Sequence, residues 1–181
     1  MKGIVFTSLA DMVEEHHGIE LWEKVLKVSK VDSGGVYTSG KTYSDSELFS
    51  LVQVLQKELD VDTDDLIRSF GMYLFSVLVG RHPHFHEAEP TFIGFLKSIK
   101  DVIHVEVKKL YEQATVPRFT YENEHKDRLT MYYQSPRKLC MLAEGLIYAA
   151  ADKYKVNIEL SHLQCMHQGS HHCEFLVEVI D

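Results

Sequence analysis

The stretch Tyr132-Tyr133-Gln134-Ser135-Pro136-Arg137 joins two segments with different residue patterns. Residues 129–133 are rich in side chains that favour a strand, and residues 138–153 have the spacing of an amphipathic helix. Alternate residues of an extended segment share one face. A phenol, a hydroxyl and a guanidinium on one face can hold a carboxylate or a phosphate. The sequence therefore predicts an anion clamp made of three side chains: Tyr133, Ser135 and Arg137.

The same stretch also has the pattern of a helix start. Ser135 is a favoured N-cap residue, and Pro136 is favoured at the first helical position. On this interpretation the two residues only turn a strand into a helix over residues 136–153. The interpretations are compatible because a helix N-terminus attracts anions, and both stay open at this point.

The composition is that of an ordinary globular protein. Of 181 residues, 45% are apolar and 25% charged, which predicts one domain over residues 1–181 with a sizeable core. The net charge of -8 argues against binding to a nucleic-acid backbone. No apolar run approaches the roughly 20 residues that span a bilayer, and the N-terminal apolar stretch is short for a signal peptide. We expect a cytoplasmic protein.

Hydrophobic periodicity divides the chain into a helical first part and a second part rich in strands, so we expect an α+β fold. A capping box, Ser44 with Glu47, opens one of the helices, and a glycine turn at 168–170 joins two strands. The C-terminal strands are expected to form an antiparallel sheet. The helices are predicted at 4–18, 19–28, 44–59, 62–78, 90–114 and 136–153, and the strands at 118–121, 128–133, 156–163 and 173–180.

Histidine is abundant, with 11 residues, and two groups raise the question of a metal. His82, His84 and His86 alternate around Pro83, and this polar loop is better explained as a solvated turn. His104 lies on the predicted helix 90–114, on the flank of its apolar stripe and not at its centre. A histidine in that position is usually half-buried with a polar partner, so periodicity alone does not single it out.

Motifs along the whole chain resemble those of H-NOX domains, the haem-nitric oxide/oxygen sensors related to the sensor part of soluble guanylate cyclase. The clamp has the pattern of the family's haem-propionate motif, Tyr-x-Ser-x-Arg. The resemblance covers essentially all 181 residues. Its further matches are Met1-Lys2-Gly3, Asp101-x-x-His104, Ala114-Thr115-x-Pro117-Arg118 and Glu144-Gly145-Leu146.

The resemblance implies a haem b buried between the helical part and the sheet. His104 is implied as the proximal iron ligand and Pro117 as a contact on the macrocycle. The propionates would be held by the clamp residues Tyr133, Ser135 and Arg137.

The residues on the opposite side of such a haem determine which gas is bound. Members of the family that hold oxygen stably resemble one another in a distal tyrosine, and that position corresponds here to Leu142. A supporting polar residue corresponds to Leu74. A hydrogen bond to polarised dioxygen is worth about 1.5–3 kcal/mol, whereas NO gains little from it. The resemblance therefore implies selectivity for NO and CO over O2, unless Tyr73 or Tyr148 supplies a donor.

A second constellation is independent of haem. All three cysteines follow residue 139, and His162-x-x-Cys165 has metal-ligand spacing. If the last two strands pair and the 136–153 helix packs on them, a tetrahedral zinc set is predicted: Cys140, His162, Cys165 and Cys173. Rival ligands are His167, His171 and His172, and three unligated thiols in a reducing compartment are the alternative. Thiol oxidation would add a redox input to a zinc site.

The predicted function is a gas sensor and not an enzyme. The resemblance implies that NO weakens the bond between iron and His104, that the helix moves, and that a separate partner responds. A histidine kinase or a cyclic-di-GMP enzyme is the implied partner. Two alternatives remain: a metal-dependent hydrolase built on the His82 or Cys165 clusters, and a module that binds another small carboxylate without iron.

Overall fold

The computed structural model describes residues 1–110 and 114–180, without the side chains of residues 110, 123 and 124. Its elements occur in the predicted order. The helical elements are α1 Gly3–His17, α2 Ile19–Ser29, α3 Asp45–Leu59, α4 Thr63–Arg81, α5 His84–Glu87, α6 Phe92–Ser98, the π-helical turn η1 Ile99–Ile103, α7 His104–Leu110, α8 Cys140–Tyr154 and the 3-10 turn η2 Met166–Gln168. The strands are β1 Arg118–His125, β2 Arg128–Gln134, β3 Asn157–Gln164 and β4 Cys173–Ile180.

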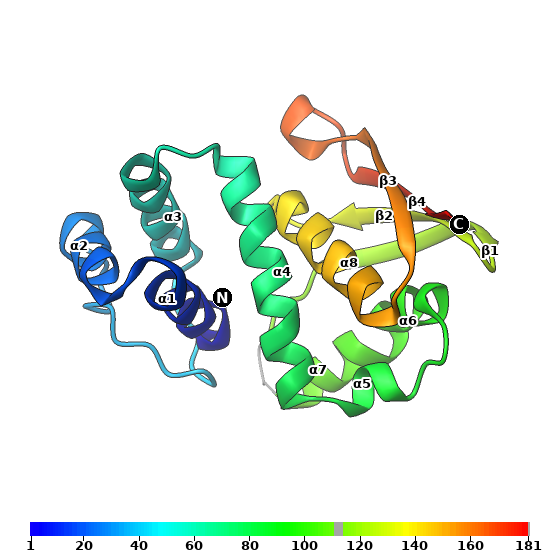
Figure 1. Cartoon of the computed structure of the whole chain (residues 1–181), viewed down its shortest axis with the longest axis horizontal. Coiled ribbons are helices and arrows are strands. Elements are labelled where there is room, and N and C mark those ends of the chain that lie inside the picture. The colour runs from blue at the N-terminus through cyan, green and yellow to red at the C-terminus, as the bar shows by residue number, and fades with distance from the viewer. Residues whose placement is uncertain (111–113, 181) are drawn as a thin grey trace.

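Helices α1, α2 and α3 gather at one end of the molecule and pack with α4 around a first hydrophobic cluster (Figure 1). The cluster is built from the apolar residues that recur at helical spacing, including Leu51 and Leu55 of α3. Ser44 is the N-cap of α3, as predicted, and its Oγ accepts from the backbone N–H of Ser46. Glu47 does not complete the capping box, because its carboxylate accepts hydrogen bonds from Ser33 and Tyr37 instead.

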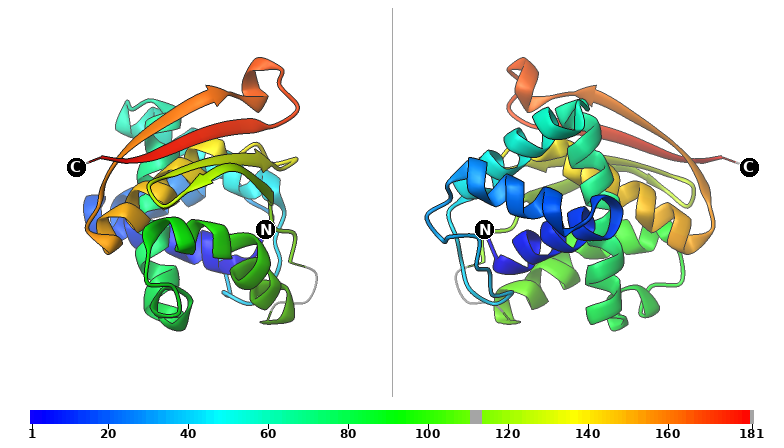
Figure 2. Two further views of the ribbon diagram at one scale, coloured as in Figure 1. Left: turned by 90° about the vertical axis from the view of Figure 1, so that its right-hand side faces the viewer. Right: turned by 60° about the vertical axis from the view of Figure 1, so that its left-hand side comes forward.

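The four strands form one antiparallel sheet in the order β1-β2-β4-β3. Leu129, Met131 and Tyr133 alternate along β2 and are buried on the inner face, where α8 packs against the sheet. Tyr133 pairs with Cys173, the first residue of β4. Figure 2 shows β3 and β4 on the outer side of the molecule. Within the described residues, no helix is both long and apolar enough to cross a membrane.

Helices α4 and α8 join the two halves of the fold and cross at two glycines. A Cβ on Gly145 would lie 2.0 Å from the Arg68 carbonyl oxygen, and one on Gly71 would lie 2.4 Å from that of Leu142. Both obstacles are backbone atoms, which cannot rotate away as a side chain can. The crossing therefore requires glycine at both positions.

Replacing Gly145 with alanine is expected to lower the free energy of unfolding by about 2–4 kcal/mol, because the helices must move apart. The matched control is Gly80→Ala on α4, where an added Cβ meets nothing within 4 Å. Thermal unfolding of both variants measures the difference, about 4–16 °C for a chain of this size. Equal midpoints for the two variants would contradict the close approach of α4 and α8 as the reason for these glycines.

Two predicted helices have different bounds in the structure. The helix predicted from Pro136 begins at Cys140, with Leu139 as its N-cap. Ser135 and Pro136 instead open a β-turn that the backbone N–H of Lys138 closes on the carbonyl of Ser135. The fixed φ of proline suits the second position of such a turn, so the prediction of a helix start at Ser135-Pro136 was wrong.

The helix predicted over 90–114 begins at Phe92 and is interrupted by the π-helical turn at Ile99–Ile103. The predicted end at Ala114 depends on residues 111–113, which lie outside the described residues. The turn predicted at His82–His86 contains one helical turn, α5. These three histidines are not among the residues that gather as a possible metal site in the described part of the chain.

Candidate functional site

A cavity of about 350 Å³ lies between the helical half and the sheet. Its walls come from α1, α4 and α8 on one side and from the segment between α6 and α7 on another, with β1 and β2 contributing inner-face residues. Its volume is in the range of small-molecule sites. The cavity is lined mostly by apolar side chains. Its polar lining residues come from several parts of the chain: Lys2, Thr42, His82, His104, Thr115, Tyr133, Ser135 and Arg137.

The three clamp residues all line this cavity, as their alternation along the chain predicted. Arg137 donates from Nε to Asp45 Oδ2 and from a terminal nitrogen to the Thr115 carbonyl, both at 2.8 Å. The Tyr133 hydroxyl accepts from the Leu139 backbone N–H at 3.1 Å. Burial raises the pKa of Tyr133 to about 12, so its phenol stays protonated at neutral pH.

Asp45 at the start of α3 was not predicted as part of the site. Partial burial alone would raise the pKa of its carboxyl, but hydrogen bonds from the Met1 amino group and from Arg137 hold that pKa below its usual value. Asp45 is therefore ionised and fixes the guanidinium at the cavity. The pair is 92 positions apart in the sequence, and no local pattern reveals it.

His104 also lines the cavity, together with Pro117. Burial and the charge of Lys108 lower the pKa of the imidazole to about 4, and a hydrogen bond to the Pro117 carbonyl opposes this shift. The ring is neutral at neutral pH, which is the form that ligates a metal. In metal-binding histidines, the ring nitrogen that does not ligate the metal typically donates a hydrogen bond to a carboxylate or a backbone carbonyl, as to Pro117 here.

The π-helical turn explains how His104 reaches the cavity. An uninterrupted α-helix would leave it on the flank of the apolar stripe, as the sequence indicated. A π turn has one extra residue, which rotates the next part of the helix back by about 100°, the angle per residue of an α-helix. His104 then faces the cavity with Ile103 and Val107, while Val102 and Val105 are exposed. His104 is half-buried and has the Pro117 carbonyl as a polar partner, as expected for a histidine on the flank of the stripe. The π turn explains why its ring also lines the cavity.

The wall formed by α1, α4 and α8 is apolar. Every residue that these three helices contribute is a hydrocarbon side chain: Ile4, Val5, Phe75, Leu78, Val79, Leu142, Ala143, Leu146 and Ile147. Leu142 is among them, whereas Leu74 is buried in the first hydrophobic cluster and is not a lining residue. The two tyrosines that would have introduced a donor, Tyr73 and Tyr148, are not lining residues of this cavity either, and Tyr73 donates to Glu15.

These features together fit an iron porphyrin. A haem needs an apolar slot, an axial ligand and polar partners for its two carboxylates. The cavity has a neutral imidazole on one side and a guanidinium with two hydroxyls at another edge. Sequence reasoning found His104 and the three clamp residues. It missed Asp45 and also Phe75 and Leu78, whose helical spacing on α4 indicates only burial.

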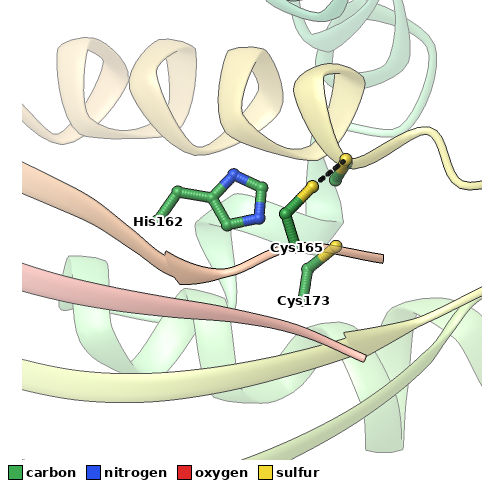
Figure 3. A group of neighbouring side chains, drawn as sticks. His162, Cys165 and Cys173 are labelled. Atoms are coloured by element: carbon green, nitrogen blue, oxygen red, sulfur yellow. Dashed lines mark hydrogen bonds between the residues drawn. The ribbon is translucent and has the colours of Figure 1, made fainter. Parts of the chain in front are cut away.

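The three cysteines and His162 form a second, separate group between α8 and the sheet (Figure 3). Their ligand atoms all lie within 4.8 Å of one another, and the sulfur atoms of Cys140 and Cys165 are 3.9 Å apart. Burial raises the pKa of the Cys140 and Cys173 thiols, so both are protonated unless a cation is bound. The prediction that these four residues lie close together in the fold is confirmed.

The surroundings of His162 suit a metal ligand. Its Nδ1 is 2.7 Å from Glu144 Oε1, and Arg68 donates to the other carboxylate oxygen at 2.9 Å. Its Nε2 is buried and has no hydrogen-bond partner among the described residues. A carboxylate–histidine pair with the second nitrogen turned to a cation is common at zinc sites. Of the rival histidines, His167 contacts the Lys138 carbonyl and His172 packs against Tyr132.

Comparison with known proteins gives consistent matches. A family model described as haem-NO-binding matches residues 2–162. An H-NOX protein from S. oneidensis, solved in the Fe(II)NO ligation state, is 37% identical, with a TM-score of 0.94 and 100% of each chain covered. The Fe(II) unliganded H-NOX protein from K. algicida is 33% identical, with a TM-score of 0.91 over 100% of this chain and 97% of that one. The predicted α+β fold is confirmed.

A more distant match is the soluble guanylate cyclase gcy-32 of Caenorhabditis elegans, which is 25% identical over 158 residues. The match covers 84% of this chain but 23% of the cyclase. The chain thus spans about a quarter of the length of this relative.

Proposed function

The chain belongs to the family of haem-NO-binding (H-NOX) domains, which are haem-based gas sensors, and we propose that it senses NO and CO in preference to O2. The observation that carries the proposal is a cavity with a neutral histidine on one side and a wall of hydrocarbon on the other. Such a site offers an axial ligand, and the described lining residues of α1, α4 and α8 have no side-chain donor for a polar gas. His82, which directly follows α4, also lines the cavity.

Each residue of the site is assigned a role in holding the cofactor. His104 would be the ligand of a haem b, and Pro117 would contact the macrocycle. The clamp residues Tyr133, Ser135 and Arg137 would hold the propionates. Asp45 fixes the guanidinium of Arg137 in advance, which reduces the entropy lost on binding. When bound, the iron would supply the position that binds the gas.

Selectivity between gases follows from the wall that contains Leu142. A hydrogen bond to polarised dioxygen contributes about 1.5–3 kcal/mol, and its absence weakens O2 binding by roughly ten- to a hundredfold. NO does not depend on such a bond. The hydrocarbon side chains from α1, α4 and α8 support this preference.

Replacing Leu142 with tyrosine is expected to strengthen O2 binding by about ten- to a hundredfold, because a phenol then reaches the apolar wall. The matched control is Leu142→Phe, which adds the ring without the hydroxyl. Absorption spectra of both reduced variants, titrated with O2, measure the effect. Equal O2 affinities in the tyrosine and phenylalanine variants would contradict the assignment of Leu142 to the gas-binding side.

The signal is proposed to leave through the helix that carries His104. When the hold on His104 weakens, the segment 99–110 is free to shift, and its outward side exposes Val102 and Val105 on either side of the histidine. A separate protein that contacts this region would detect the shift. A histidine kinase or a cyclic-di-GMP enzyme remains the proposed output partner, and a cytoplasmic location remains a prediction.

We also propose that Cys140, His162, Cys165 and Cys173 hold one structural Zn2+. Three thiols and one imidazole are a standard tetrahedral set. The carboxylate of Glu144 orients His162, and the unpaired Nε2 supports a cation between the four groups. Oxidation of the thiolates would release the ion and give the protein a redox input in addition to the gas.

A further inference from the structure

The π-helical turn at Ile99–Ile103 interrupts the helix that carries His104. The turn is closed by the backbone N–H of His104, which donates to the carbonyl of Ile99. Turns of this kind are rare and are frequent at functional sites. The five residues of the turn include neither proline nor glycine. A side chain that enters the hydrogen-bond ladder is another known source of helix irregularity.

Tyr121 of β1 supplies such a side chain. Its hydroxyl donates to the carbonyl of Leu96 at 2.9 Å, just before the wide turn begins. In an α-helix this carbonyl accepts from the backbone N–H of Lys100, and a side-chain donor competes for it. The ring of Tyr121 stacks on Phe119, its neighbour on β1, with an angle of 4° between the ring planes. This stacking fixes the direction in which the hydroxyl points from the sheet.

A second donor acts on the neighbouring carbonyl. Ser98 is buried, and its Oγ donates to the carbonyl of Phe95 at 2.7 Å. Two consecutive carbonyls of α6, those of Phe95 and Leu96, thus accept from side chains where the helix widens. Of these two donors, only Tyr121 connects this point to the sheet.

We propose that Tyr121 is a positioning residue for His104: its hydroxyl holds the Leu96 carbonyl so that the helix widens over 99–103 and turns the imidazole into the cavity. The proposal rests on the proposed role of His104 as iron ligand. Without the wide turn, His104 returns toward the flank of the stripe, about 100° away. The sheet thereby sets the direction of the imidazole through one hydrogen bond.

The test uses Tyr121→Phe, which keeps the ring and its stacking on Phe119 and removes one oxygen. The control is Tyr132→Phe, whose hydroxyl donates to Glu122 at 2.9 Å on the outer face of the sheet. In the haem-loaded protein we expect a shifted or broadened iron–histidine stretching band for Tyr121→Phe and an unchanged band for the control. In the haem-free protein we expect amide hydrogen exchange at 100–104 to be about five- to tenfold faster for Tyr121→Phe only.

The outcomes separate this proposal from the proposed function. Unchanged exchange and an unchanged band in Tyr121→Phe would overturn it. Faster exchange with an unchanged band would also overturn it, because Tyr121 would then stabilise the helix without positioning His104. Ser98→Ala, expected to change both in the same direction, provides a second variant if Tyr121→Phe folds poorly. If the protein takes up no haem, both the proposed function and the role assigned to Tyr121 are overturned. If the wild-type protein shows a normal iron–histidine band and Tyr121→Phe leaves that band unchanged, only the role of Tyr121 is overturned.

Discussion

Replacing His104 with glycine is expected to abolish the response of the protein to NO while leaving its fold intact. The imidazole lines the cavity and is the proposed iron ligand, and glycine would leave a gap that imidazole from solution can fill. The reduced variant should lose the iron–histidine stretching band, and millimolar imidazole should restore it. Regulation of a partner by NO should be lost, because the ligand is no longer connected to the helix 99–110.

The matched control for this variant is His172→Gly. His172 packs against Tyr132 on the outer face of the sheet, away from the cavity. Its removal should leave the band and the NO response unchanged. A His104→Gly protein whose partner still responds to NO would contradict the proposed route of the signal.

Replacing Cys173 with alanine is expected to lower zinc content from about one ion per chain to near zero. Loss of an outer-sphere partner alone weakens zinc sites by about 10–100-fold, and loss of a direct ligand should cost more. Cys173 is fully buried on the face of the sheet that α8 covers, so a thiol from solution cannot replace it as a ligand. Elemental analysis of the purified protein and a competitive chelator titration measure the effect.

The control here is His167→Ala, the nearby histidine that contacts the Lys138 carbonyl instead of the cluster. This variant should keep its zinc. The melting temperature of Cys173→Ala should fall by about 6–12 °C if zinc contributes about 3 kcal/mol. Wild-type protein that binds no zinc with nanomolar affinity would leave the four residues as a buried thiol cluster and would remove the proposed redox input.

The sequence predicted the class of the fold because its periodicities are long and clean. Leu51 and Leu55 recur at helical spacing, and Leu129, Met131 and Tyr133 alternate as in a half-buried strand. The clamp followed from the same alternation. The cysteine cluster followed from topology, because pairing of the last two strands brings Cys165 and Cys173 together beneath α8.

The features that the sequence did not predict depend on contacts between distant segments. Asp45 reaches Arg137 across 92 positions, and Tyr121 reaches the helix that carries His104 across 25. The contact of Tyr121 accompanies the π turn at 99–103. The spacing of hydrophobic residues in the sequence does not reveal this change of helical register. The start of α8 was misplaced for a related reason: Pro136 fits a β-turn as well as a helix start.

The central claim is that a haem binds on His104 and that the opposite wall discriminates between gases. An absorption spectrum of the purified, reduced protein, taken before NO, after NO and in air, tests it most directly. We predict a Soret band in the region of about 390–430 nm that shifts with NO and does not change to a stable oxygenated form. A stable oxygenated spectrum would contradict the apolar wall at Leu142, and the absence of a Soret band after reconstitution with haem would contradict the sensor itself.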